Sequence, residues 1–74
     1  MVEPKEKREA AVVIGDRLRA LRLEKGMLQR EMGAALEISE ATWRLYELGL
    51  RIPNDEIKKR ISVYFEMTID ELFF

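Results

Sequence analysis

The segment 28–49 constrains the fold of this chain more than any other, and it reads LQREMGAALEISEATWRLYELG. Apolar residues at spacings of three and four within 32–36 predict one short amphipathic helix, and Trp43 and Tyr46 share one side of a second. The break between them is so short that the second helix must cross the first. Two helices in this relation form a helix-turn-helix, whose second helix can lie in the major groove of DNA.

Capping residues predict where the helices begin and end. Ser39 precedes the second helix of the unit, where its hydroxyl can accept a hydrogen bond from a free backbone N–H. Gly49 ends that helix, as a residue free to adopt the left-handed conformation does. Further along the chain, Asn54 or Asp55 is the expected cap of the next helix.

Three further helices flank the central pair. The first has apolar residues at spacings of four and three within 14–21 and stops at Gly26. The second has an apolar stripe within 57–65, and the third opens at a capping box formed by Thr68 and Glu71. Five helices without a strand pattern predict an all-α bundle. A chain of 74 residues makes one small domain. We expect a charged tail or helix extension over residues 1–13 and the domain over residues 14–74.

Composition excludes several classes of function. The chain has no cysteine and no histidine, so it lacks disulfides, thiolate metal ligands, and the commonest general base and metal ligand. We therefore expect that the protein is not an enzyme and that it has no cofactor, no metal site and no evident small-molecule ligand. No apolar run approaches a membrane span and no signal-peptide pattern appears, so a reduced cytoplasmic setting is the prediction.

The charge distribution is unusual for a nucleic-acid binder, because the net charge is −1. Residues 14–25 carry four basic and two acidic residues, whereas residues 28–49 carry two basic and four acidic ones. The second helix of the unit is therefore not a basic stripe. Any contact with phosphate must come from a few residues around it and from helix N-termini, whose free N–H groups bind anions.

Five segments carry a resemblance to a known family: IGDRLRALRLEKG, LQREMGAALEIS, TWRLYELG, IP and MTIDELFF. Over residues 14–73, about four fifths of the chain, it resembles the Cro/repressor-type helix-turn-helix domains of the xenobiotic-response-element family. The resemblance implies a five-helix, lambda-repressor-like bundle. It also implies a transcriptional regulator that binds operator DNA as a homodimer. The operator it implies is palindromic, with two symmetric half-sites.

The resemblance assigns roles to individual residues. Gln29 matches a glutamine that contacts phosphate, and Arg51 matches a basic loop residue near the DNA backbone. Arg22 and Glu47 match an ion pair inside the fold. The residues that match base-contacting positions are Glu40, Ala41, Arg44 and Leu45. Three of these four residues have a plainer alternative: a solvated residue for Arg44, a first-turn charge for Glu40, and a core position for Leu45.

The sequence departs from the family pattern at several places. Leu28 stands where a capping Thr or Ser is usual, and Leu48 stands, like Leu45, where polar or basic residues are common. Trp43 replaces a small branched core residue, and we expect it in the core because it shares a face with Tyr46. Lys58 takes a position that is usually apolar.

The C-terminal end is the most apolar part of the chain. Its apolar residues form either a homodimer interface, which is our prediction, or the last layer of the core; they are Ile69, Leu72, Phe73 and Phe74.

Two functions of different class fit the sequence. One is a sequence-specific regulator that binds double-stranded DNA, favoured by the intact spacing and by Gln29, Arg44 and Arg51. The other is a protein-interaction module of antirepressor-like or antitoxin-like type with weak or lost DNA binding, favoured by the acidic balance. We predict the first.

Overall fold

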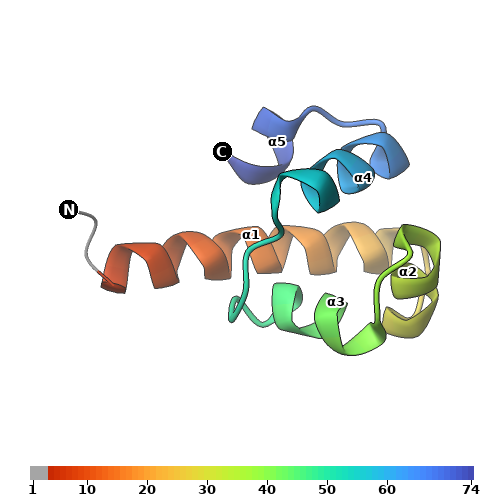
Figure 1. The fold of residues 1–74 in the computed structure, drawn as a ribbon, viewed down its shortest axis with the longest axis horizontal. Coiled ribbons are helices and arrows are strands. Elements are labelled where there is room, and N and C mark those ends of the chain that lie inside the picture. Colours follow the sequence, from red (N-terminus) through yellow and green to blue (C-terminus); the bar gives the residue numbers. More distant parts are fainter. Residues whose placement is uncertain (1–3) are drawn as a thin grey trace.

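The computed structural model describes the backbone of residues 4–74 and the side chains of residues 9–74. This part of the chain forms five helices and no strand, which confirms the predicted all-α fold (Figure 1). The helices are α1 (Pro4–Glu24), α2 (Gln29–Leu36), α3 (Glu40–Glu47), α4 (Asp55–Phe65) and α5 (Ile69–Phe73). Helix α1 crosses the expected boundary between residues 13 and 14 without a break.

The predicted caps are present at three helix starts. Ser39 and Asn54 each accept a hydrogen bond, at 3.0 Å, from the backbone N–H three residues further on. Thr68 and Glu71 exchange the two reciprocal bonds of a capping box, at 2.9 and 3.0 Å. These bonds satisfy N–H groups that have no partner within the helix, so short helices of five to eleven residues can start at defined places.

The core lies between α1 and the other four helices. Figure 1 shows α1 along the length of the molecule, with α3 on one side, α4 and α5 on the other, and α2 at the end of α1. Trp43 is fully buried and meets Tyr46 edge to face, with ring centroids 6.2 Å apart, as expected for core residues. The buried core residues are Ile14, Leu18, Met32, Leu36, Trp43, Tyr46, Ile57, Ile61, Leu72 and Phe73.

A close approach of two backbones brings α3 against α1. A Cβ atom on Gly15 would lie 2.5 Å from the carbonyl oxygen of Tyr46 and 2.6 Å from that of Glu47. Only a glycine permits this spacing, so the residue that weakens α1 as a helix is required for its packing. Gly49 follows α3 with φ +72° and lies against the backbone of Val12 in α1.

The C-terminal end places Leu72 and Phe73 in the core of the single chain, which is the alternative to a dimer interface for these two residues. The homodimer interface stays a prediction. Arg17 of α1 donates to the carbonyl oxygen of Leu72 at 2.6 Å, which ties α5 to α1. Of the four predicted residues, Phe74 is 81% exposed and Ile69 is partly exposed.

None of the helices in the described part of the chain combines the length and the apolar run needed to cross a membrane.

Lys58, at its unusual position, lies with its ammonium 5.5 Å from the ring centroid of Phe73. The face of the aromatic ring attracts the positive charge of the lysine.

Candidate nucleic-acid interface

The outward side of α3 carries the residues predicted to contact base edges. The helix begins after the Ser39 cap and packs against α1 and α2, and its inward side holds Trp43 and Tyr46 in the core. Leu45 is half-buried, so it lies between the exposed base-contacting position and the core position that were predicted for it. The exposed residues on and just after α3 are Glu40, Ala41, Arg44 and Leu48.

A buried ion pair holds the inward side of α3 to α1. The Arg22 guanidinium donates to both carboxylate oxygens of Glu47, from Nε to Oε2 at 2.6 Å and from Nη2 to Oε1 at 3.1 Å. The side chains are only 10% and 3% exposed. The Trp43 indole N–H also donates to Glu47, and Arg22 donates to the backbone carbonyl of Met27 at 2.7 Å. Buried charge is tolerated here because both groups are paired and hydrogen-bonded.

These contacts change the protonation equilibria of the pair. Burial by itself raises the pKa of Glu47, but the hydrogen bonds from Arg22, Gln29 and Trp43 together outweigh it and hold the pKa below the ordinary value. The hydrogen bond to Glu47 raises the pKa of Arg22. The pair is therefore charged at neutral pH.

Gln29, the first residue of α2, joins the buried pair to the exposed side of α3. Its amide nitrogen donates to Oε1 of Glu47 at 3.1 Å, and its amide oxygen lies 3.4 Å from Nε of Arg44. Arg44 is also 3.4 Å from the carboxylate of Glu40, one turn earlier on α3. Four charged residues and one amide thus form a continuous network. The predicted phosphate contact of Gln29 did not indicate this internal role, and no local sequence pattern signals it.

The start of α2 lacks a side-chain acceptor. Leu28 occupies the N-cap position with an extended backbone, and its own N–H donates to Glu31 at 2.8 Å. Only one of the two bonds of a capping box can therefore form, because leucine has no acceptor. The first N–H groups of α2 consequently remain open to an anion. Sequence reasoning did not use the three-residue spacing of Leu28 and Glu31, which is the signal for this bond.

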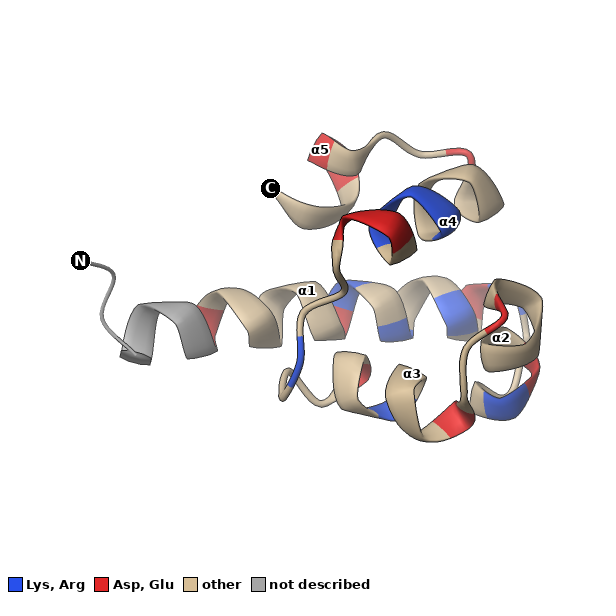
Figure 2. Cartoon of the chain, viewed as in Figure 1, with Lys and Arg blue, Asp and Glu red and all other residues tan. Residues whose placement is uncertain are grey.

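Both acidic and basic residues lie on and around α3. Figure 2 shows acidic positions at both ends of α3 and a basic position between them, which are Glu40, Glu47 and Arg44. Arg30 on α2 and Arg51 in the loop after α3 are exposed. Arg30, Arg44 and Arg51 are therefore exposed basic side chains on α2, on α3 and in the loop that follows α3.

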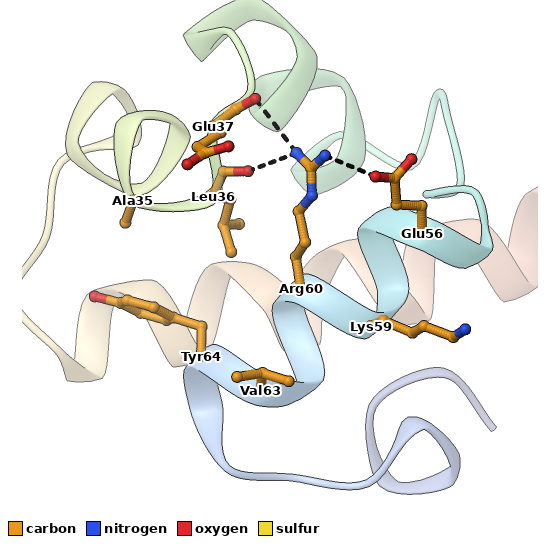
Figure 3. Close-up of a pocket in the computed structure, with 8 residues that line it drawn as sticks. All are labelled: Ala35, Leu36, Glu37, Glu56, Lys59, Arg60, Val63 and Tyr64. Atoms are coloured by element: carbon orange, nitrogen blue, oxygen red, sulfur yellow. Dashed lines mark hydrogen bonds and ion pairs between the residues drawn. The ribbon is translucent and has the colours of Figure 1, made fainter.

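A groove of about 480 Å³ lies at the other end of α2, between α2 and α4 (Figure 3). Arg60 reaches across from α4 and donates to the carbonyl oxygen of Leu36 at 3.0 Å, and it also pairs with Glu56 at 3.0 Å. It thereby satisfies a C-terminal carbonyl of α2 and holds the helix-turn-helix to the rest of the fold.

Comparison with known proteins identifies the class. A family model described as a helix-turn-helix domain matches residues 13–72. The chain belongs to this helix-turn-helix domain family, whose members are typically DNA-binding and not enzymatic. No curated protein and no solved structure matches the chain.

Proposed function

We propose that this protein is a sequence-specific transcriptional regulator of the Cro/repressor type within the xenobiotic-response-element family. It inserts α3 in the major groove of an operator. The observation that carries the proposal is the division of α3 into two sides. Its inward side is anchored by the buried Arg22–Glu47 pair, while its outward side exposes Glu40, Ala41 and Arg44.

The residues around α3 take different parts in this complex. Arg44 reads a base edge, and Glu40 accepts from a cytosine amino group or serves as a first-turn charge. Ala41 and the exposed part of Leu45 contact thymine methyl groups. Arg51 and the open N-terminus of α2 at Gln29 contact phosphate, which positions the domain without reading sequence.

The regulator acts as a homodimer on a palindromic site. One recognition helix reads only a few base pairs, whereas two copies related by a twofold axis place their helices about 34 Å apart, one turn of DNA. Phe74 and Val13 are exposed beside a groove of about 230 Å³ between α1 and α5. We place the dimer contact there, and we include the partly exposed Ile69 of α5 in it.

Selection from a random pool of duplexes at low salt tests DNA binding and stoichiometry together. We expect a twofold-symmetric consensus, and an affinity that falls with salt by a slope of about −0.9 per phosphate neutralised. Arg44→Ala should relax the preference at one base pair, and Arg51→Ala should weaken all duplexes equally. Failure to enrich any sequence, or an affinity indifferent to salt, contradicts the proposal.

Sedimentation tests the dimer contact separately. Phe74→Ser should lower the apparent mass and weaken binding to the palindrome far more than binding to a half-site. Leu23→Ser is the matched control, because Leu23 is also an exposed apolar residue of this chain but lies away from the groove lining. A parent protein that is monomeric at high micromolar concentration contradicts the homodimer.

A protein-interaction module is the second candidate, and a specific observation favours it. Leu48 and Leu50 are 58% and 72% exposed beside the outward side of α3. Apolar exposure of this kind marks binding surfaces for proteins more often than for phosphate. Substitution of both residues by Ser distinguishes the two functions, because it should leave the affinity for DNA within about twofold if α3 acts through Arg44.

A further inference from the structure

The orientation of one side-chain amide is determined by a buried charge. Glu47 carries a carboxylate that accepts bonds from Arg22, Trp43 and Gln29, and it has no proton to donate. The Gln29 side chain must therefore direct its NH₂ group towards Glu47, because its carbonyl oxygen would meet the carboxylate with like charge. Its oxygen consequently faces Arg44, at 3.4 Å from Nε.

Arg44 is contacted along one edge only. Gln29 lies at its Nε and Glu40 lies at its Nη2, each at 3.4 Å. These contacts are long, so each is weak, but both engage the same side of the planar guanidinium. Within the described part of the chain, no hydrogen bond involves its Nη1. The end of the guanidinium formed by Nη1 and the second N–H of Nη2 is thus left to face outward.

We propose that Gln29 is a positioning residue that turns the end of the Arg44 guanidinium towards the DNA, where it takes a guanine. An arginine can pair with the O6 and N7 acceptors of guanine through two parallel N–H groups. With Nε turned to Gln29, the pair formed by Nη1 and Nη2 remains for the base. This inference rests on the proposed function, and it makes Gln29 a determinant of specificity as well as a phosphate contact.

The chain offers a way to separate positioning from phosphate binding. A residue that only contacts phosphate contributes equally to all sequences, so its loss leaves the ratio of affinities unchanged. A residue that orients Arg44 affects the ratio. Gln29→Met keeps the length of the side chain and removes both its donor and its acceptor. Arg30→Met is the matched control, because it removes an exposed neighbouring cation that is not among the hydrogen-bond partners of Arg44 in the described part of the chain.

The test compares affinities for the selected duplex and for the same duplex with its guanine at the Arg44 position replaced. Gln29→Met should lower this ratio by about tenfold, within the range for one bidentate arginine–guanine pair. Arg30→Met should weaken both duplexes and preserve the ratio. In an Arg44→Lys background, Gln29→Met should have no further effect on the ratio, because lysine has no Nε edge to be held. An unchanged ratio in Gln29→Met overturns the proposal.

A measurement on the free protein distinguishes failure of this inference from failure of DNA binding. We expect the Nε–H of Arg44 to exchange with water several-fold more slowly than that of Arg30, by nuclear magnetic resonance, and to lose this protection in Gln29→Met. Equal exchange at Arg44 and Arg30 in the parent overturns the positioning role. A protected Arg44 in a protein that prefers no base pair overturns the proposed function instead, and the guanine assignment with it. Thermal melts of Gln29→Met establish that the variant is folded.

Discussion

Glu40 and Glu47 lie on the same helix, two turns apart, and each is paired with an arginine, yet their surroundings differ. Glu47 meets Arg22 at 2.6 Å with its side chain 3% exposed, whereas Glu40 meets Arg44 at 3.4 Å with its side chain 47% exposed. The first pair joins α3 to α1 across 25 residues, and the second joins neighbours one turn apart. Burial and geometry, more than the identity of the residues, therefore determine what an ion pair contributes.

The difference separates folding from recognition. Removing one partner of the buried pair leaves a desolvated charge without compensation, which is costly. Removing a partner of the exposed pair leaves a charge that water screens, and it also leaves that charge free for DNA. The buried pair at the end of α3 thus holds the helix in place. The exposed residues at the start of α3 can differ between target sequences without loss of the fold.

The largest expected effect comes from Glu47→Gln and Arg22→Met. Each should lower the free energy of unfolding by about 3–5 kcal/mol, because each leaves a buried charge unpaired. At roughly 4–8 °C per kcal/mol for a domain of this size, the melting temperature should fall by roughly 12 °C or more. Thermal melts check this, and Glu40→Gln is the matched control. Melts of both variants that coincide with the parent would show that the pair is not buried.

The next effect concerns the glycine that allows the backbone of α3 to approach α1. Gly15→Ala should destabilise the fold by about 1–3 kcal/mol, because the added methyl group overlaps the backbone of α3. Alanine is the better helix former by about 1 kcal/mol, so a gain in stability is the expectation from α1 alone. Ala20→Gly, at an exposed position of α1, should show that ordinary helix effect in the opposite sense. A more stable Gly15→Ala would contradict the close contact.

A smaller effect is expected from acid. The pKa of Glu47 is lower in the folded protein than in the unfolded chain, so its contribution to stability is complete above the unfolded value of about 4.3. The contribution is lost as the pH falls through the folded pKa, because the unfolded chain then binds the proton first. Urea midpoints from pH 7 to pH 3 measure the loss. In Glu47→Gln the urea midpoint should fall less steeply with decreasing pH than in the parent. An equal fall in the parent and the variant would contradict the assignment to Glu47.

The smallest effect on stability is expected from Glu40→Gln. It should change the free energy of unfolding by no more than about 0.3–0.5 kcal/mol, the usual contribution of an exposed pair one turn apart on a helix. The same variant removes a negative charge beside Arg44, so it should bind a nonspecific duplex more tightly at low salt. Chemical unfolding and binding to a nonspecific duplex measure the two effects. A loss of stability as large as that in Glu47→Gln would remove the distinction between the pairs.

Sequence reasoning predicted the five helices of this fold. It also named the exposed residues on α3, Glu40, Ala41 and Arg44, whose contacts with DNA stay predictions. Ser39, Asn54 and the Thr68/Glu71 box mark helix starts because a cap acts on a backbone N–H only three residues away. The burial of Trp43 follows from its sharing a helix side with Tyr46. These features depend on short spacings, so they can be derived before any tertiary contact is known.

Tertiary structure alone decided where residues far apart in the sequence meet. Gly15 weakens a helix when α1 is considered alone, but it becomes necessary once the carbonyl groups of α3 lie against it. Leu72 and Phe73 are as apolar as an interface requires, and only the return of α5 onto α1 places them in the core. The direction of the Gln29 amide likewise depends on a carboxylate 18 residues away. Local sequence determines the helices because their bonds span a few residues, whereas burial is a property of the whole packed chain.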